Sequence, residues 1–262
     1  ITVQNEPLNR GNSASLFMGW KEQQTFIGEA LGPALKRAGL KTKLYAFDHN
    51  YNYDRMEDQQ QYPLRVYDDE VTAAFLTGAA YHNYGGNRRE LLRIGEARPD
   101  KELIFTETSI GMWNDGRNLK RRLTDDMREV ALGTVNNGCR AVIVWNFMLD
   151  TDRGPFRPGG CGTCYGAVDL DKDDLRTITL NSHYYIIGHL SSVVRRGAVR
   201  LAADYEQPRD GLMCSAFRNP DGTLAAVILN EKEQEQTVSL MAGNGRYINV
   251  RIPARAVCSI QW

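Results

Sequence analysis

The chain has 262 residues, of which 42% are hydrophobic and 24% charged, enough apolar material for one large domain or for a large and a small one. Its 32 basic and 32 acidic residues give a formal net charge of zero, which removes the electrostatic reason to expect nucleic acid or an anionic membrane as partner. No apolar run of the sequence approaches the roughly 20 residues that a membrane-spanning helix requires.

Up to about residue 190, short β-rich runs alternate with longer helix-like runs. The expected strands are residues 1–4, 43–47, 78–82, 102–106 and 141–145. The expected helices are residues 20–38, 68–76, 88–97, 123–136 and 182–193. Almost continuously apolar strands that are separated by helices are typical of a parallel sheet buried on both faces. Five such βα units predict an α/β fold that is part of a (β/α)8 TIM barrel rather than a whole one.

From about residue 198 the pattern changes to short runs without intervening helices. The expected strands are residues 199–205, 212–218, 224–230, 237–241, 247–252 and 257–262. The Asn-Pro-Asp-Gly sequence at residues 219–222 is a strong turn signal between two of them. We therefore predict a partial (β/α)8 catalytic barrel over residues 1–193 and an antiparallel β-sandwich domain over residues 194–262.

Cysteine and histidine usage indicates neither a disulfide scaffold nor a metal motif. The chain has five cysteines, an odd number, and only Cys161 and Cys164 lie close together. These two are either a local disulfide or two loop thiols. The four histidines show no spacing of the His-Glu-x-x-His type, so we expect no metal site.

Polar or aromatic side chains close all five expected strands of the barrel part. In a parallel barrel the functional groups lie at the C-terminal ends of the strands, where the βα loops begin. The residues at these positions are Asn5-Glu6-Pro7, Asp48-His49-Asn50, His82-Asn83-Tyr84, Glu107 and Trp145-Asn146. Groups of this kind are suited to binding and cleaving sugars.

Two of these residues, Glu6 and Glu107, suggest cleavage of a glycosidic bond. One carboxyl group must protonate the leaving oxygen while the other attacks the anomeric carbon or activates water, and retention of configuration needs the two about 5–5.5 Å apart. Their environments must differ, so that one stays protonated and the other is ionised. Asn5 can hydrogen-bond a sugar hydroxyl, and Tyr84 can hold the nucleophile. A single strand-end glutamate would more often be a surface or salt-bridged residue.

Four further residues are candidates for substrate binding. Trp145 and Trp113 offer flat apolar faces to pyranose rings, although Trp145 can also pack the mouth of the barrel. His82 is expected in the site because it ends a strand. Asp48, like its neighbour His49, either lines the cleft or caps the segment that follows.

Several motifs resemble those of glycoside hydrolase family 30, whose members include glucosylceramidase and endo-β-1,6-glucanases. Residues 2–7 (TVQNEP) are similar to the acid/base motif of that family, and residues 105–109 (FTETS) to its nucleophile motif. Residues 82–84 look like its strand-six motif, with asparagine where glucosylceramidases carry tryptophan. Residues 145–146 match its strand-eight segment, and residues 182–191 resemble the passage into its β-domain. The likeness covers essentially the whole chain in the same order.

The resemblance implies a two-step displacement with retention, in which Glu6 is the acid/base, Glu107 is the nucleophile, and no metal or organic cofactor takes part. Glu6 then ends barrel strand four, so the chain is the C-terminal part of the enzyme, about strands 4–8, and we expect it to be inactive alone. The loops at residues 48–54 and 159–166 look more like the glucanase branch. This favours a β-1,6-glucan oligosaccharide or polysaccharide as substrate, with glucosylceramide or small β-glucosides as the alternative. We expect a secreted, periplasmic or cell-surface bacterial protein.

Other classes of protein explain the motifs less well. A non-catalytic sugar-binding barrel predicts binding without turnover, but it does not explain why both carboxylates stand in intact motifs. A Ser-His-Asp hydrolase needs Gly-x-Ser-x-Gly after a strand, and the sequence has no such pentapeptide. The sequence leaves open endo or exo action, the oligomeric state, and whether Cys161 and Cys164 are bonded.

Overall fold

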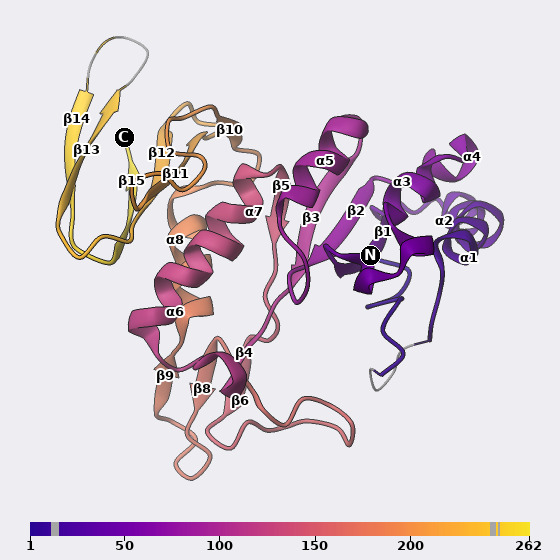
Figure 1. Ribbon diagram of the computed structural model, residues 1–262, viewed down its shortest axis with the longest axis horizontal. Helices are drawn as coiled ribbons and strands as arrows, with labels where there is room; N and C mark the ends of the chain where they lie inside the picture. Colours follow the sequence, from indigo (N-terminus) through magenta and orange to yellow (C-terminus); the bar gives the residue numbers. More distant parts are fainter. Residues whose placement is uncertain (12–15, 242–244, 246) are drawn as a thin grey trace. The chain divides into compact units, whose positions relative to one another are not determined.

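Two units make up the chain in the computed structural model (Figure 1). The structure describes residues 1–11, 16–241, 245 and 247–262. The first unit contains residues 1–109, 137–145 and 155–162, and the second contains residues 110–136, 146–154 and 163–262. The domain boundary expected between residues 193 and 194 stays a prediction. Within the described ranges, no helix combines the length and the apolar character that crossing a bilayer requires.

A parallel sheet in the order β1-β2-β3-β5 forms the centre of the first unit. Its strands are β1 (Tyr45–Asn50), β2 (Gly78–His82), β3 (Glu102–Glu107) and β5 (Cys139–Val142). Each overlaps an expected strand, although β5 ends before the expected Trp145. The chain beyond β5 still follows the loop after β3, because the Trp145 N–H donates to the Thr108 carbonyl at 2.7 Å.

The strand expected at residues 1–4 is wrong. Among the described residues, one parallel bridge between Thr2 and Tyr45 is the only ladder contact of this segment. The chain leaves extended geometry at Glu6, whose φ is 47°. The Glu6 N–H then donates to the Asp48 carbonyl at 3.0 Å, which holds the turn against the end of β1. The parallel sheet therefore has four strands where the sequence suggests five.

Helices separate these strands. The helices expected at residues 20–38 and 88–97 are confirmed, whereas the one expected at residues 68–76 is present only over residues 70–73, behind an additional helix at residues 62–67. The first helical run consists of α1 (Trp20–Thr25), the π-helical η1 (Phe26–Leu31) and α2 (Gly32–Arg37). It ends before Gly39, whose φ of 64° fits the left-handed residue that commonly follows a helix. The other elements are η2 (Tyr53–Arg55), η3 (Glu57–Gln59), α3 (Tyr62–Tyr67), α4 (Glu70–Ala73) and α5 (Arg89–Ala97).

The core of the first unit is aromatic. Phe47, Tyr81 and Phe105 lie on three neighbouring strands and are fully buried. The ring centroid of Phe47 is 5.3 Å from that of Tyr81 and 4.9 Å from that of Tyr62. Burying each such side chain contributes about 1.5–3 kcal/mol. This packing fixes the strand ends, where the predicted site residues lie.

Gly78 begins β2 at a point where the neighbouring strand leaves no room for a side chain. A Cβ atom on Gly78 would lie 1.8 Å from the Glu102 carbonyl oxygen of β3. We expect Gly78→Ala to lower the free energy of unfolding by about 2 kcal/mol or more, because strand backbone must move. Urea denaturation measures this change.

Gly95→Ala is the matched control for Gly78→Ala. Gly95 lies inside α5, and its Cβ would meet only the Leu103 side chain, at an ordinary 3.4 Å. Alanine favours a helix over glycine by about 0.5–1 kcal/mol, so this variant should be slightly more stable than wild type. Equal stability of the two variants would contradict the close approach of β2 to β3.

The second unit contains an antiparallel sheet in the order β10-β11-β12-β15 and a separate two-stranded sheet. The four strands are β10 (Val199–Leu201), β11 (Leu212–Arg218), β12 (Leu224–Asn230) and β15 (Ala256–Gln261). The two-stranded sheet pairs β13 (Gln236–Met241) with β14 (Tyr247–Ile252). Their buried core includes Cys214, Ile228 and Ile252. These strands match the antiparallel part that the sequence predicts, with the predicted turn at residues 219–222.

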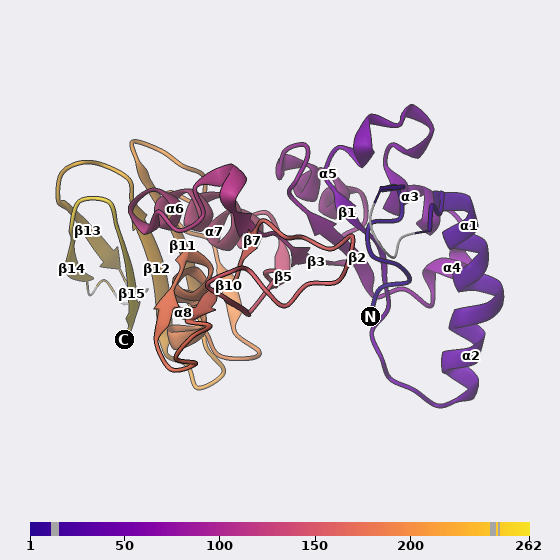
Figure 2. The same cartoon turned by 90° about the horizontal axis from the view of Figure 1, so that it is seen from below.

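Helices and short strands complete the second unit. The helices are α6 (Leu119–Asp126), η5 (Met127–Ala131), α7 (Leu132–Asn136) and α8 (Ser182–Val193), with a single turn η4 (Met112–Asn114). α8 packs against β12 and β15 (Figure 1 and Figure 2). The sequence misses β4 (Ile110–Gly111), β6 (Met148–Asp150), β7 (Cys164–Tyr165), β8 (Val168–Leu170) and β9 (Ile178–Leu180). Runs this short carry too little periodicity to be recognised.

A cavity of about 550 Å³ lies among the strands of the second unit. Its lining is mostly aliphatic and aromatic, and includes Tyr205, Phe217, Leu240 and Trp262. The predicted catalytic residues belong to the first unit and do not line it. The cavity therefore does not locate the chemistry.

Candidate active site

Irregular pairing at the ends of β1 and β2 brings the candidate side chains together. The register of β1 with β2 shifts between Phe47 and His49, and that of β2 with β3 shifts between Tyr81 and His82. Phe47 and Asp48 have φ values of 74° and 78°, which side-chain-bearing residues rarely adopt. Such a bulge re-aims side chains and is common beside active sites. The side chains of Asp48, His49 and His82 therefore lie close together at the C-terminal ends of β1 and β2.

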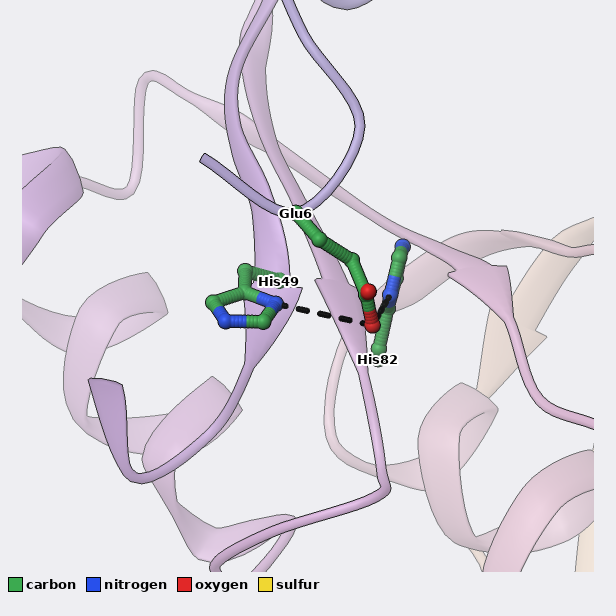
Figure 3. Close-up of side chains that lie close together, drawn as sticks. All are labelled: Glu6, His49 and His82. Atoms are coloured by element: carbon green, nitrogen blue, oxygen red, sulfur yellow. Dashed lines mark ion pairs between the residues drawn. The ribbon is translucent and has the colours of Figure 1, made fainter. Parts of the chain in front are cut away.

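Glu6 lies between two histidine rings (Figure 3). Its side chain is 8% exposed, and its Oε1 atom lies 3.8 Å from His49 Nδ1 and 3.6 Å from His82 Nδ1. Its Oε2 atom accepts a 2.8 Å hydrogen bond from Asn9. Burial raises the pKa of Glu6, but its interactions with His82 and Asn9 and the charge of His49 outweigh burial and lower the pKa to about 2.

Asp48 holds His82 from the other side of its ring. His82 Nε2 lies 3.0 Å from Asp48 Oδ1, and the Thr106 and Thr2 hydroxyls each donate a 2.6 Å hydrogen bond to the same carboxylate. Burial lowers the pKa of His82, but Asp48 and Glu6 outweigh burial and raise it to about 9. His82 in turn lowers the pKa of Asp48 against the effect of its burial. Asp48 thus orients His82, and its contact with a substrate stays a prediction.

Glu107 ends β3 directly beside His82, its register partner on β2. The Tyr84 hydroxyl donates a 3.0 Å hydrogen bond to Glu107 Oε1 and lies 2.9 Å from the Ser109 hydroxyl. This is the contact through which Tyr84 would hold a nucleophile. Burial raises the pKa of Glu107 and the charge of Glu6 adds to this, while His82 and Tyr84 act in the opposite direction.

The other predicted site residues are less closely tied to this group. Asn5 is exposed and adjoins Glu6 in the chain. Trp145 is 37% exposed and is bound through its backbone to Thr108, next to Glu107. Trp113 belongs to the second unit, in η4, and is 54% exposed. The roles assigned to these three residues stay predictions.

Sequence reasoning missed three polar residues that support the group. Asn9 binds Glu6, Ser109 contacts Tyr84, and Asp54 lies 2.9 Å from His49 Nε2. All three follow a strand-end residue within five positions of the chain. Polar residues just beyond a strand end were therefore the available signal, but the sequence does not show which of them turn back toward the sheet.

The chain is similar in sequence and in fold to known proteins. Residues 197–260 match the family model described as "Glycosyl hydrolase family 30 beta sandwich domain". The chain is 29% identical to the endo-1,6-beta-D-glucanase BGN16.3 of Trichoderma harzianum, over 98% of the chain and 50% of that protein. It is 28% identical to putative glucosylceramidase 2 of Caenorhabditis elegans, over 88% of the chain and 45% of that protein.

A solved structure titled "The endo-beta1,6-glucanase BT3312" is also similar. It is 59% identical in sequence, with a TM-score of 0.97 over 100% of this chain and 57% of that one. The chain spans about half the length of the curated relatives it matches first. The coarse fold that the sequence predicts, an α/β barrel-type part with a β-sandwich, is consistent with these matches. Residues 197–260 are thus similar to the β-sandwich domain of glycosyl hydrolase family 30, and the chain is similar along nearly its whole length to endo-1,6-β-glucanases.

Proposed function

We propose that the protein carrying this chain is a retaining glycoside hydrolase that cleaves β-glucosidic bonds, with a β-1,6-glucan as substrate. The observation that carries the proposal is the group at the sheet edge, in which His82 contacts Glu6 and Tyr84 binds Glu107. The pKa values of the two carboxyl groups shift in opposite directions, as expected for a pair with different tasks. The similarity to two proteins named as endo-1,6-beta-glucanases supports the substrate class.

In this double displacement, the Glu107 carboxylate attacks the anomeric carbon and the glycosidic C–O bond breaks, which leaves a glycosyl ester on Glu107. Glu6 gives a proton to the departing oxygen. It then takes a proton from the water that attacks the ester, and Glu107 leaves as a carboxylate. The hydrogen bond from Tyr84 fixes the orientation of Glu107 for the first attack.

The resting pKa of Glu6 is the reverse of what a general acid needs. A pKa of about 2 leaves Glu6 ionised at neutral pH, whereas the acid must carry a proton. His82, with a pKa of about 9 and its Nδ1 atom 3.6 Å from Glu6 Oε1, carries that proton instead. Glu6 and His82 then titrate as one coupled pair, which holds one proton that can pass to the leaving group. The same positive charge favours the ionised form of Glu107, which is the form that attacks.

We also propose that the parallel sheet is the later part of a (β/α)8 barrel. In this proposal β1, β2, β3 and β5 are barrel strands five to eight, and the segment ending at Glu6 is the end of strand four. The parallel order of the sheet and the helices between its strands support this placement. The position of the candidate residues at C-terminal strand ends also supports it.

The proposed location is outside the cytoplasm, in the medium, the periplasm or at the cell surface. Cys161 and Cys164, whose pairing the sequence leaves open, are disulfide-bonded. Disulfides persist mainly in oxidising compartments, which supports export of the protein.

A direct comparison of two substrates tests the proposed function. The purified chain and the gene product that contains it are incubated with pustulan, a β-1,6-glucan, and with glucosylceramide in detergent. We expect the gene product to cleave pustulan with a kcat/KM roughly tenfold or more above that for glucosylceramide, with the β-anomer appearing first by NMR, and we expect the chain alone to be inactive.

Glucosylceramidase activity is the second candidate, favoured by the similarity to the putative glucosylceramidase of C. elegans. Preference for glucosylceramide would establish it in place of the glucanase. Binding of pustulan without turnover by either polypeptide would establish a non-catalytic sugar-binding protein.

A further inference from the structure

We propose that Glu6, His49 and His82 form a binding site for a divalent transition-metal ion of the zinc class, and that the bound ion blocks Glu6. Each residue offers one ligand atom, and these atoms lie within 4.8 Å of one another. All three residues are buried in the first unit, and Figure 3 shows both rings turned toward the same carboxylate. The effect on catalysis rests on the proposed function, but the binding of the ion does not.

The two distances from Glu6 to the histidines are close to those that an ion requires, and the third ligand pair lies within 4.8 Å. Zinc binds imidazole nitrogen and carboxylate oxygen at about 2.0–2.2 Å, so two ligands of a tetrahedral ion lie about 3.4 Å apart. Glu6 Oε1 lies 3.8 Å from His49 Nδ1 and 3.6 Å from His82 Nδ1. Shifts of a few tenths of an ångström would bring both pairs to that spacing.

The two ring nitrogens that face Glu6 are the second, independent observation. His49 and His82 have side chains 1% and 0% exposed. Neither Nδ1 atom has a hydrogen bond of normal length to a described residue, since Glu6 Oε1 lies 3.6–3.8 Å away. A buried polar atom without a hydrogen bond of normal length costs free energy, so the arrangement favours a ligand between the rings.

The opposite nitrogen of each ring has the partner that metal-binding histidines usually have. His49 Nε2 lies 2.9 Å from Asp54 Oδ2, and His82 Nε2 lies 3.0 Å from Asp48 Oδ1. A carboxylate at Nε2 holds a proton there and orients the ring, so a metal binds at Nδ1; on binding, the metal displaces the proton that His82 Nδ1 carries toward Glu6. Both histidines therefore present Nδ1 as a ligand.

The donor set selects the kind of ion. Two imidazoles and one carboxylate suit zinc and its neighbours, whereas calcium and magnesium prefer oxygen ligands. Three protein ligands leave a fourth position for water. An ion held here occupies the Glu6 oxygen that faces His82, so Glu6 can no longer exchange a proton with a leaving group. The site is thus inhibitory.

Isothermal titration of the untagged, EDTA-treated chain with zinc chloride tests the site. We expect one ion per chain, and no heat of binding with magnesium chloride. His49→Gln should weaken zinc binding by about 100-fold, and Asp54→Asn by about tenfold, because an amide does not draw the proton to Nε2. Asp54 is partly exposed, so this second variant should fold even if His49→Gln does not.

His189→Gln is the matched control, since His189 lies in α8 with its Nδ1 atom 2.9 Å from Ser259 Oγ. It should bind zinc as wild type does. When cobalt is bound in place of zinc, its absorption spectrum should show no thiolate-to-cobalt charge-transfer band. Such a band would instead indicate binding to one of the free cysteines, Cys139, Cys214 or Cys258. Absence of zinc binding, or binding that neither Asp54→Asn nor His49→Gln weakens, would overturn the proposal.

Activity measurements separate this inference from the proposed function. Zinc should suppress pustulan hydrolysis by wild type, and EDTA should restore it. Hydrolysis that is unaffected by zinc, in a protein that binds it at this site, overturns only the inhibitory role. Zinc binding in a protein that never hydrolyses pustulan overturns only the proposed function.

Discussion

Glu107→Gln is expected to lower kcat/KM for pustulan by about 10⁴-fold or more, because an amide cannot form the glycosyl ester. Glutamine has nearly the same volume and can still accept the hydrogen bond from Tyr84, so the fold should persist. Steady-state kinetics measures the loss. A 2-deoxy-2-fluoro-glucoside with a good leaving group, followed by mass spectrometry, should label Glu107 in the wild-type protein.

Glu102→Gln is the control for this variant. Glu102 lies at the opposite end of β3, where it binds Lys43 and Tyr45. Its removal should leave kcat/KM near the wild-type value. If Glu107→Gln hydrolyses pustulan as fast as Glu102→Gln does, residue 107 is not the nucleophile.

Glu6→Ala is expected to reduce pustulan hydrolysis by about 10²–10⁴-fold, the usual contribution of general acid–base catalysis. The loss should be much smaller for the first step with a dinitrophenyl glucoside, because that leaving group departs without a proton. Burst kinetics with this substrate separates the two steps. Alanine also removes one of the two carboxylates that raise the pKa of His82, so this pKa should fall, which NMR titration of the ring can follow.

Azide distinguishes the two carboxyl groups by stereochemistry. With Glu6→Ala, azide should attack the glycosyl ester and give the β-glucosyl azide, with retention. With Glu107→Ala, azide should replace the nucleophile and give the α-azide. The opposite assignment of products would show that the roles of the two residues are exchanged, as their resting pKa directions alone would suggest.

Elements with strong periodicity could be predicted from the sequence almost to the residue. β2, β11, β12, β14 and α8 have the expected bounds. β2, β11 and β12 are mostly apolar runs, β14 contains apolar residues interleaved with polar ones, and α8 is bounded by a clear change in pattern, so local signals suffice. The strand-end rule also selected Glu6, His82, Tyr84 and Glu107, which the structure brings into one group.

The remaining features depend on contacts between distant parts of the chain. The bulge at Phe47 and Asp48 arises where β1 meets β2, and no local pattern marks it. Because the sequence does not reveal this bulge, it could not show that Asp48 faces His82 rather than solvent. The segment of residues 1–4 is likewise limited to one bridge with Tyr45, which no local pattern of the sequence shows.

The left-handed backbone at Phe47 and Asp48 limits how far the protein can be made more heat-tolerant by substitution. Glycine at either position would relieve a conformational penalty on the order of 1–2 kcal/mol. However, Phe47 fills the aromatic core and Asp48 orients His82, so each gain would be offset by lost packing or lost reactivity. An engineer should therefore leave these two peptide units unchanged and seek robustness at sites such as Gly95.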